Sequence, residues 1–517
     1  MTSVTRISGD SFSIATPFHL ASYYGLRRYF VNRSADEGAL SALLSTTINL
    51  PHLCGLGGDC IILRSSPDGM LTPYNGTGRT GRGHCPDHLN SMGHSYVPRR
   101  GLVSAMVYGA PSALKKYSND FSIDVSSVVS DLKDEIGKDQ IISTGLRYFL
   151  KQHREELQSG LMSAGWLARF KLANRELRRD STPDLFRHIA AEGFSTFYTG
   201  TIGARVSEYL RKYSESVFHE SDISAFAPVR SEAHEISFFG ARVSMHAVNT
   251  PWIQLCVSLK VVEQVLGPSS RLNYASTMRF LCDLSGAVDH AIRSHSGLSH
   301  HTVDDFDKVE IVEQILAATL AELDRSAGYP ASFGATDTIF LAVAQSDGTV
   351  VGMTSSIFTP FGSMVDPGNV GTLLSNRAHS FALESAAYAP LRPGVAAPHT
   401  TNVLIVENDR FKFALGTTGG LVQTQVLIQL LYRIIACGDD PQSALDAPRF
   451  ANMGWSEKHQ SVVRMCESSL SGVCSDFTIE PDCSIKFGVA QIAGLLKASG
   501  QCFAAVDPRG EGAGLAV

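Results

Sequence analysis

The sequence predicts a protein of mixed helices and strands with a large amount of buried core. Hydrophobic residues make up 44% of the 517 residues and charged residues only 18%, which is ample material for burial. Residues 126–330 have a mostly helical pattern, whereas hairpin patterns follow at 338–357 and 404–415. Length alone allows two to four domains, or one α/β sandwich whose layers come from all parts of the chain.

The N-terminal elements form one unit over residues 12–65. A helical pattern around Asp36–Leu44 leads into the glycine-rich run 53–59 and then into a strand at Cys60–Leu63. Farther along, an apolar stretch at 243–262 fits neither a helix nor a strand pattern cleanly.

The C-terminal third is rich in strand patterns. The runs Thr338–Ala344 and Thr349–Ile357 are hydrophobic on both faces, which is typical of a sheet buried between two layers. The second hairpin continues into Gly416–Gly420 and a helix over Leu421–Cys437 with apolar residues at a spacing of four. Near the end, the pattern predicts a short helix over Gly488–Lys497 followed by a last strand.

Composition and charge restrict the partners. Forty-four basic and fifty acidic side chains give a net charge of −6, without the basic excess typical of nucleic-acid binding, so we expect a small-molecule substrate. No run approaches the roughly 18 apolar residues of a membrane span, and Met1–Leu20 lacks the apolar core of a secretory signal. Ten cysteines without a C-x-x-C pair favour reduced thiols. We therefore expect a cytoplasmic protein that binds neither nucleic acid nor a membrane.

Two motifs suggest cofactors, and the sequence around each argues against them. Gly76–Gly81 satisfies G-x-G-x-x-G, but a dinucleotide site needs a helix at the last glycine, and Arg82–Pro86 is poor helix material. A polar group resembles a metal site by composition, but its spacing matches no strong zinc pattern and its segment resembles a loop; its members are His295, His300, His301, Asp304 and Asp305. We expect no cofactor and no metal.

Thr338 is the predicted nucleophile. A hydroxyl is weakly nucleophilic and needs a base, and a threonine at a chain N-terminus can use its own α-amine, whose pKa is about 7.7–8.0. That amine must be made by cleavage between Asp337 and Thr338, through attack of the Thr338 Oγ on the Asp337 carbonyl and hydrolysis of the ester. Taken alone, the residue is also an ordinary β-branched start of a strand.

Gly419 and Gly420 are the predicted oxyanion donors. They lie between a predicted strand and the N-terminus of a helix, where backbone N–H groups approach a ligand closely and negative charge is favoured. A tight strand-to-helix turn explains two glycines equally well, and position alone does not distinguish these interpretations.

A series of short motifs runs through the chain in a definite order. They are Ala15–Ala21, Pro51–Asp59, Asn75–Arg79, Thr338–Gly348, Phe361–Ser363, Pro367–Gly368, Leu373–Arg377, Gly416–Gly420, Ala444–Phe450 and Asp507–Ala513. This order resembles the γ-glutamyltranspeptidase family of N-terminal-nucleophile (Ntn) hydrolases over most of the chain. The resemblance implies an α+β fold, the four-layer αββα sandwich.

The resemblance also implies a division of the chain. Residues 1–337 become the large-subunit segment and residues 338–517 the small-subunit segment, and both are intertwined in one globular αββα unit. The two fragments are expected to stay associated after cleavage, with a homodimer of such heterodimers as one assembly open to them.

The same resemblance assigns roles to single residues. Counting back ten residues from Gly348 places the family's catalytic threonine at Thr338. Ser356 falls where the family has a hydroxyl that supports the nucleophile's amine. His399 and Thr400 fall where a pair of polar residues helps to hold the substrate and the oxyanion.

The predicted substrate pocket departs from the family. Thr77 stands where the transpeptidases have the arginine that binds the glutamyl α-carboxylate, and Ser380 where they have a carboxylate that binds the α-amine. Phe358 replaces an asparagine that contacts substrate. Since a charge-assisted hydrogen bond contributes roughly 1.5–3 kcal/mol, losing two would weaken a glutamyl substrate by orders of magnitude.

Three further residues are predicted to contact substrate. Arg79 lies two residues after Thr77, and Asn376 and Arg377 belong to the family's substrate-binding motif. Either arginine is available to hold a different carboxylate. Ile339 replaces a hydroxyl residue after the nucleophile, which affects the expected rate of self-cleavage but not its position.

The leading interpretation is an autoprocessing hydrolase or acyltransferase that uses an N-terminal threonine on an amide-type bond of a small molecule, other than an ordinary γ-glutamyl substrate. Two alternatives stay open. One is a carbon–carbon bond hydrolase of antibiotic biosynthesis on the same scaffold, which would release a carbon acid instead of an amine. The other is an unprocessed relative that binds a ligand without chemistry.

Overall fold

A computed structural model gives the structure of the chain. It describes residues 6–136, 140–158, 164–167, 170–173, 176–179, 183–213, 217–268, 274–295, 307–323, 338–385, 387–456, 461–473 and 476–517. Five residues named above lie outside these ranges: Asp337, on the amino side of the predicted cleavage site, and His300, His301, Asp304 and Asp305 of the polar group.

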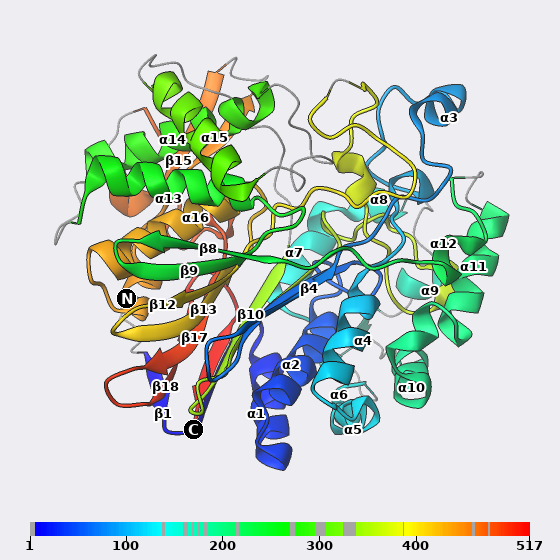
Figure 1. Cartoon of the computed structure of the whole chain (residues 1–517). Coiled ribbons are helices and arrows are strands. Elements are labelled where there is room, and N and C mark those ends of the chain that lie inside the picture. Colours follow the sequence, from blue (N-terminus) through cyan, green and yellow to red (C-terminus); the bar gives the residue numbers. More distant parts are fainter. Residues whose placement is uncertain are drawn as a thin grey trace.

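Two antiparallel sheets form the centre of the molecule (Figure 1). The larger sheet has the order β1 (Ile7–Gly9), β18 (Cys502–Val506), β17 (Ala490–Leu496), β13 (Phe411–Thr417), β12 (Val403–Glu407), β9 (Ala241–His246) and β8 (Ala233–Phe238). The second sheet has the order β19 (Ala513–Ala516), β2 (Phe12–Thr16), β10 (Ile339–Gln345), β11 (Val350–Ser356), β3 (Asp59–Ser65) and β4 (Leu71–Gly76). Both predicted hairpins, β10–β11 and β12–β13, are confirmed.

The two sheets pack face to face, and β10 lies at the centre of the packing. Successive side chains of a strand point to opposite faces of its sheet. Phe340, Ala342 and Ala344 therefore belong to the core shared with the larger sheet, whereas Leu341 and Val343 belong to the core beneath the helices. This arrangement explains why the strand is apolar at every position from 339 to 344.

The approach of the sheets is close enough to require glycine. A Cβ on Gly416 of β13 would lie 2.4 Å from the ring of Phe340, and one on Gly352 of β11 would lie 2.7 Å from Val403. Both distances are shorter than non-bonded carbon atoms allow, so these glycines let the two sheets pack closely.

Helices cover the outer faces of both sheets. The second sheet is covered by α1 (His19–Asn32), α2 (Ala35–Asn49) and α4 (Ala110–Asp120). The larger sheet is covered by α13 (Trp252–Leu266), α14 (Tyr274–Ser294), α15 (Lys308–Leu323) and α16 (Val422–Leu431). Figure 1 shows these two groups on opposite sides of the strands. The predicted four-layer αββα sandwich is confirmed.

The remaining elements lie outside this sandwich or connect its layers. The other helices are α3 (Pro86–Ser91), α5 (Val125–Asp131), α6 (Lys133–Ile136), α7 (Thr144–Gln152), α8 (Arg154–Gln158), α9 (Ala164–Leu167), α10 (Pro183–Glu192), α11 (Thr201–Tyr213), α12 (Ser221–Ser224) and α17 (Pro441–Asp446). Two small sheets contain β14 (Phe450–Ser456), β15 (Ser461–Glu467) and β16 (Thr478–Glu480), and β5 (Gln140–Ile141), β7 (Glu176–Arg179) and β6 (Phe170–Ala173).

One predicted element is wrong. The helix predicted over Gly488–Lys497 is strand β17, which pairs with β13 on one side and β18 on the other. Its buried apolar run fits a fully buried strand as well as a helix, because periodicity does not distinguish the two over so short a length. The unclassified stretch 243–262 divides into the end of β9 and the start of α13.

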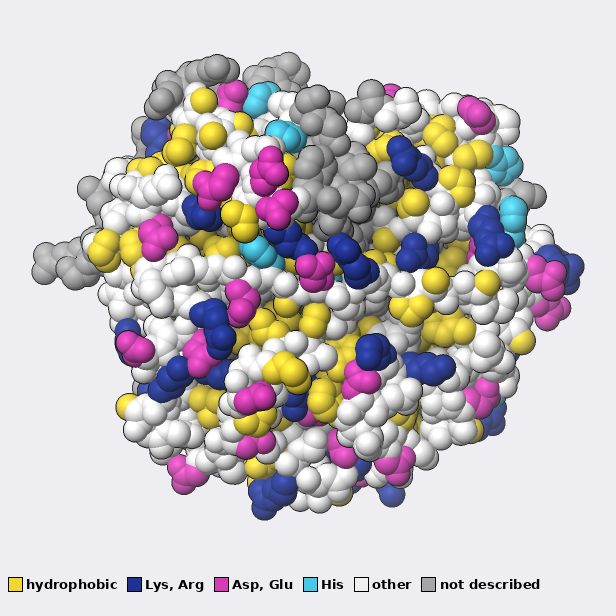
Figure 2. Space-filling model, viewed as in Figure 1, with side chains coloured by type: hydrophobic (Ala, Val, Ile, Leu, Met, Phe, Trp, Pro, Cys, Tyr) yellow, Lys and Arg dark blue, Asp and Glu magenta, His cyan; other side chains and the backbone are white. Residues whose placement is uncertain are grey.

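The surface carries charges of both signs. Figure 2 shows acidic and basic side chains interspersed over the face in view, as the nearly balanced composition leads one to expect. In the part of the chain that the structure describes, no helix combines the length and apolar character that crossing a bilayer requires.

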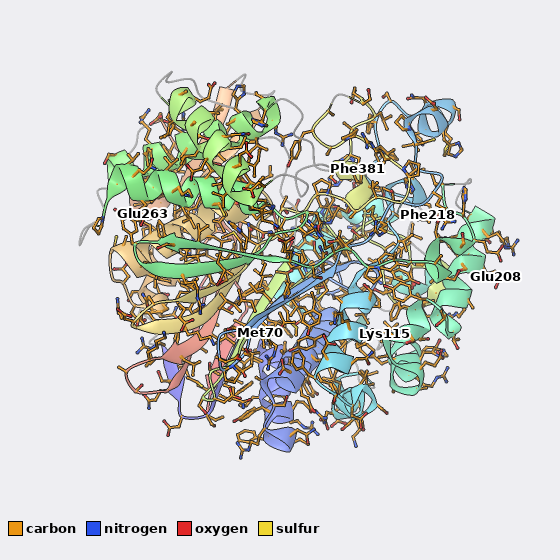
Figure 3. All side chains as sticks on the ribbon, in the orientation of Figure 1. Met70, Lys115, Glu208, Phe218, Glu263 and Phe381 are labelled. Atoms are coloured by element: carbon orange, nitrogen blue, oxygen red, sulfur yellow. The ribbon has the colours of Figure 1, made fainter. Side chains whose placement is uncertain are left out.

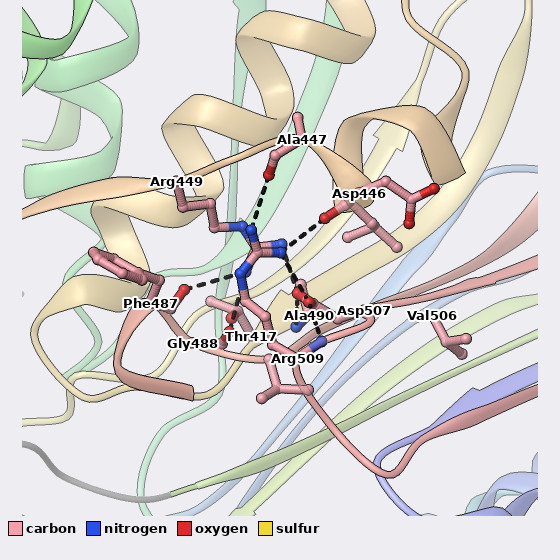
Figure 4. Close-up of polar contacts among 12 residues, drawn as sticks. Thr417, Asp446, Ala447, Arg449, Phe487, Gly488, Ala490, Val506, Asp507 and Arg509 are labelled. Carbon is pink, nitrogen blue, oxygen red and sulfur yellow. Dashed lines mark hydrogen bonds and ion pairs between the residues drawn. The ribbon is translucent and has the colours of Figure 1, made fainter. Parts of the chain in front are cut away.

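A buried ion cluster fastens the C-terminal strands to the rest of the larger sheet (Figure 4). Arg509 binds Glu467 through Nε and Nη2 at 2.9 and 2.6 Å, and binds Asp507 through Nη1 at 3.0 Å. Arg449 contacts the other oxygen of Asp507 at 2.5 Å, and all four side chains are at most 2% exposed. Because Arg449 and Asp507 also bind the backbone of residues 487–490, the cluster fixes the start of β17.

Asp507→Asn tests this cluster. The change removes the charge that Arg449 and Arg509 share, and breaking a buried pair in this way costs about 3–5 kcal/mol of unfolding free energy. Urea unfolding followed by fluorescence measures the loss. Asp476→Asn is the control, because its partner Arg279 is 55% exposed and such surface pairs contribute less than about 1 kcal/mol. Equal midpoints for the two variants would show that the cluster is not stabilising.

Candidate active site

The candidate nucleophile lies at the open end of a hairpin. Thr338 directly precedes β10 and Ser356 ends β11, and the antiparallel register pairs Ile339 with Ser355. The hairpin therefore brings residues 338 and 356 together, although eighteen positions separate them. The Thr338 Oγ1 donates a hydrogen bond to the Ser356 Oγ at 3.3 Å, and Thr338 is 1% exposed.

The Ser356 hydroxyl collects three donors. Besides Thr338, the backbone N–H of Phe358 reaches it at 3.0 Å and the Nη2 of Arg377 at 3.1 Å. A hydroxyl oxygen has two lone pairs, so these donors compete. The bond from Thr338 is the longest of the three, which makes its hydroxyl the easiest to release.

A buried ion pair lies behind this hydroxyl. The Arg377 Nε binds the Asp59 Oδ2 at 2.6 Å, and both side chains are at most 2% exposed. Asp59 also accepts the backbone N–H of Gly78 at 2.8 Å, and the His399 Nε2 lies 3.5 Å from its Oδ2. Sequence reasoning gave Asp59 no role; the only signal was its place at the end of the Pro51–Asp59 motif.

The glycines before Asp59 allow the backbone to approach closely. A Cβ on Gly58 would lie 2.2 Å from the carbonyl oxygen of Ser356, and one on Gly57 would lie 2.2 Å from that of Leu373. Only glycine fits at these two positions. This loop therefore presses directly against the strand end that carries Ser356.

Phe358 adopts an unusual backbone conformation next to the ion pair. Its φ is +77°, in the region that favours glycine, and such a conformation costs on the order of 1–3 kcal/mol in a larger residue. The side chain is buried, and its ring lies 4.9 Å from the guanidinium of Arg377. Strain of this kind gathers at functional sites, where surrounding contacts hold it in place.

Two of the residues predicted to contact substrate are engaged by the protein itself. Thr77 is fully buried, and its N–H and hydroxyl both donate to the Asn75 side chain at 3.0 and 2.6 Å. Arg79 donates to three backbone carbonyls, those of Ala227, Pro228 and Gly394. Burial lowers the pKa of Arg79.

The remaining members of the predicted substrate motif also have internal partners. Asn376 is buried and donates to the Thr359 hydroxyl at 2.7 Å and to the Arg99 carbonyl at 2.8 Å. The Ser380 hydroxyl donates to the Arg377 carbonyl at 2.8 Å. Both contacts shape the loop that follows β11.

A cavity of about 520 Å³ opens beside these residues. Of the predicted site residues, its lining includes Phe358, Ser380, His399, Thr400 and Gly420, whereas Thr338, Ser356, Gly419, Thr77, Arg79, Asn376 and Arg377 lie outside it. Most of the wall is apolar, with Val97, Trp252, Ile253, Ile292, Phe381, Leu383, Tyr388 and Leu421. Phe381, labelled in Figure 3, comes from the segment after β11.

The predicted oxyanion donors lie at the turn from β13 into α16. Gly419 and Gly420 have φ values of +109° and +59°, and a Cβ on Gly419 would lie 2.7 Å from Val422. Gly420 also lines the cavity. The turn therefore presents backbone at a helix N-terminus beside an apolar chamber, which is a favourable place for negative charge.

Asn249 connects the parts of the site and was missed in the sequence. Its side chain binds Thr77 at 3.1 Å, its carbonyl accepts the N–H of His399 at 2.8 Å, and it lines the cavity. It follows β9, 174 residues after Asn75, whose side-chain amide donates to the Asn249 side chain at 2.8 Å. Nothing in the local sequence indicates this contact.

No group of three His, Cys, Asp or Glu side chains among the described residues is arranged to hold a metal ion. The site is thus built from hydroxyls, one buried ion pair, a glycine turn and an apolar wall.

Comparison with known proteins shows what the chain as a whole is similar to. The model for gamma-glutamyltranspeptidase matches residues 33–517. The chain is 26% identical to an oxamate amidohydrolase proenzyme of Klebsiella pneumoniae, covering 98% of this chain and 99% of that protein. It is 24% identical to a glutathione hydrolase-like YwrD proenzyme of Bacillus subtilis, covering 88% of each. The crystal structure of a cephalosporin acylase from Bacillus halodurans superimposes with a TM-score of 0.85 at 21% identity, covering 100% of this chain and 98% of that one.

Ser356→Ala tests the contacts of the candidate site. The change leaves the buried Phe358 N–H and Arg377 Nη2 without their acceptor, which costs roughly 1–3 kcal/mol for an unsatisfied buried donor. Urea unfolding of the variant measures this. Ser118→Ala is a matched control, because that buried hydroxyl donates to the Leu114 carbonyl, and inside α4 this carbonyl keeps the helical N–H of residue 118 as a second donor. A loss no greater than that of the control would contradict the assignment.

Proposed function

Because the chain belongs to the gamma-glutamyltranspeptidase family and is an enzyme of the Ntn-hydrolase type, we propose that Thr338 is its nucleophile and acts on an amide-type bond of a small molecule. The observation that carries the proposal is the contact between Thr338 and Ser356 at the hairpin end, with Arg377 and Asp59 behind it. A hydroxyl held by a second hydroxyl beside a charged pair fits an activated nucleophile.

The first reaction is self-cleavage. The Thr338 Oγ attacks the carbonyl carbon of Asp337, the peptide C–N bond breaks as the nitrogen takes a proton, and an ester remains. The broken peptide bond frees the α-amine of Thr338, and water then hydrolyses the ester, which leaves a carboxylate on Asp337 and restores the Thr338 hydroxyl. That amine, with a free pKa of about 7.7–8.0, then serves as the base for the hydroxyl of the same residue.

The second reaction uses the freed threonine on the substrate. The Oγ attacks the acyl carbon, its proton passes through the α-amine to the leaving amine, and a threonyl ester forms. Water or an amine then takes the acyl group. The backbone N–H groups of Gly419 and Gly420 are the proposed donors to the oxyanion in both halves of the cycle. His399 and Thr400 line the same cavity as Gly420.

The two fragments are proposed to remain one unit after the cut. Segment 1–337 supplies β2 and β3, and segment 338–517 supplies β10 and β11 between them in the same sheet. In the larger sheet, β9 of the first segment pairs with β12 of the second. Separation would break both ladders and expose the core between the sheets, which hydrophobic burial opposes.

The substrate is proposed to differ from a γ-glutamyl compound. Thr77 and Ser380 stand at the positions of the family's two charged anchors, and the guanidinium groups of Arg79 and Arg377 are bound within the protein. A glutamyl α-carboxylate would therefore be desolvated without a cation. Amide cleavage and the alternative carbon–carbon cleavage differ in the product, an amine or a carbon acid, which mass spectrometry of a turnover mixture separates.

Self-cleavage is tested on a denaturing gel. We expect fragments of about 36 and about 19 kDa, which divide the 55.7 kDa chain in proportion to length, and a smaller fragment whose N-terminal sequence begins Thr-Ile-Phe-Leu. Thr338→Ala removes the hydroxyl and should give one undivided band. Thr336→Ala is the control, because Thr336 is the other threonine near the predicted cut, and this variant should be cut like the wild type. An undivided wild-type chain would support the non-catalytic alternative instead.

The substrate is tested by comparing acyl amides on the processed protein. We expect γ-glutamyl-p-nitroanilide to be turned over with a kcat/KM at least ~100-fold below that of a matched aliphatic or aromatic acyl p-nitroanilide, since two charge-assisted hydrogen bonds are missing. The release of p-nitroaniline is followed by absorbance. Efficient glutamyl turnover would show that the pocket has kept the family's preference.

A further inference from the structure

Phe358 and Arg377 lie one behind the other at the wall of the cavity. Phe358 lines the cavity, whereas Arg377 is 1% exposed and does not line it. The guanidinium carbon of Arg377 lies over the Phe358 ring, 4.9 Å from the ring centroid. A positive charge thus lies immediately behind an aromatic face of the cavity, and the ring separates it from whatever the cavity holds.

Arg377 retains a free donor group. Its Nε binds Asp59 and its Nη2 binds Ser356, but its Nη1 is buried and makes no hydrogen bond with any described residue. A buried guanidinium N–H without an acceptor is costly, since the group has lost its water. Arg377 therefore has the capacity to bind one more acceptor, and a carboxylate is the best one.

Among the described residues, the cavity wall offers no unpaired lysine or arginine to an anionic substrate. Among the described residues that line it, the Asp, Glu, Lys and Arg side chains are Asp289, Arg293 and Glu384, and the Arg293 Nε already binds Asp289 at 2.8 Å. A carboxylate placed here would meet the Asp289–Arg293 pair, in which the two charges offset each other, and the acidic side chain of Glu384. Burying an unpaired charge is strongly unfavourable, whereas the apolar wall favours an uncharged group.

From this arrangement we propose that Phe358 determines the substrate class: by covering Arg377 it restricts the cavity to uncharged, apolar acyl groups of aromatic size. The inference rests on the proposed function and names the acyl group that this site takes. At about 520 Å³ the cavity falls within the range of ~300–1,000 Å³ found for drug-sized ligands. Removal of the ring exposes the charge and converts the site to one that takes acyl groups with a terminal carboxylate.

The backbone at residue 358 makes the critical variant practicable. Because φ is +77° there, glycine adopts the conformation without strain, and the variant keeps the N–H that binds Ser356. Phe358→Leu is the matched control, since it keeps an apolar cover over Arg377. Phe358→Asn is the second test variant, because asparagine tolerates the left-handed region better than most residues.

The experiment compares phenylacetyl and glutaryl p-nitroanilides on the processed protein. We expect the wild type and Phe358→Leu to prefer the phenylacetyl compound by at least ~10-fold in kcat/KM, and Phe358→Gly and Phe358→Asn to lower this ratio at least ~10-fold, as one charge-assisted hydrogen bond allows. Adding Arg377→Gln to Phe358→Gly should remove the gain toward glutaryl. An unchanged ratio in folded Phe358→Gly, or a gain that survives Arg377→Gln, overturns the proposal.

Binding provides a readout that does not require turnover. In Thr338→Ala, calorimetry with phenylacetamide and with glutaramate measures the same preference, and Phe358→Gly in that background should tighten glutaramate binding at least ~10-fold unless Arg377→Gln is added. If the wild type is not cut and releases no p-nitroaniline, the proposed function fails, yet this binding result still decides the role of Phe358. If the wild type is cut and active but glutaramate binds all variants alike, only the role of Phe358 fails.

Discussion

The burial of β10 on both faces is the constraint on which the site depends. One face of the strand packs against the larger sheet and the other against the helices. A slip of one residue would exchange the two faces, so the register with β2 and β11 is strongly specified. Thr338, at the end of this strand, therefore has a fixed position relative to Ser356. The hydroxyl of the candidate nucleophile is thus placed by hydrophobic packing rather than by polar contacts.

The charged groups of the site, Asp59 and Arg377, are also held by packing of the backbone, and they lie behind the cavity wall. Asp59 is brought to Arg377 by a loop whose glycines press against the end of β11. The pair holds Ser356 through Arg377 and reaches His399 through Asp59. No charged group of this pair lies in the cavity wall. The molecule thereby keeps an ion pair next to the candidate nucleophile and an apolar surface toward the cavity.

The sequence predicted most local elements from short-range patterns, and the αββα fold from the family resemblance. The hairpin at 338–357, the glycine turn at 419–420 and the helix after it are all visible in local periodicity. The segment 488–497 was predicted as a helix, because a seven-residue buried strand has no distinguishing period. Which elements pair across the sheets is a long-range property, and only the family resemblance indicated it.

Arg79 and Arg377 show most clearly what the sequence does not predict, namely the partners of a charged side chain. Arg79 and Arg377 were the predicted carboxylate ligands, and their positions in the motifs gave no sign of their partners. Arg377 is paired with a residue 318 positions away, and Arg79 with carbonyls about 148 and 315 positions away. Whether a charge faces a ligand or the protein depends on such distant contacts. The unusual φ at Phe358 is likewise imposed by tertiary packing and has no signature in the sequence.

Strands of segments 1–337 and 338–517 are neighbours in both sheets, and this has a consequence for refolding. An intact chain refolds as a single molecule, and its stability is independent of concentration. A chain cut before Thr338 consists of two polypeptides that must meet again before β10 can enter between β2 and β3, so refolding becomes a second-order reaction with vulnerable, edge-exposing intermediates. Cleavage would thus replace thermodynamic stability by kinetic stability. The cut protein would stay folded because it unfolds slowly, and its unfolding would be effectively irreversible.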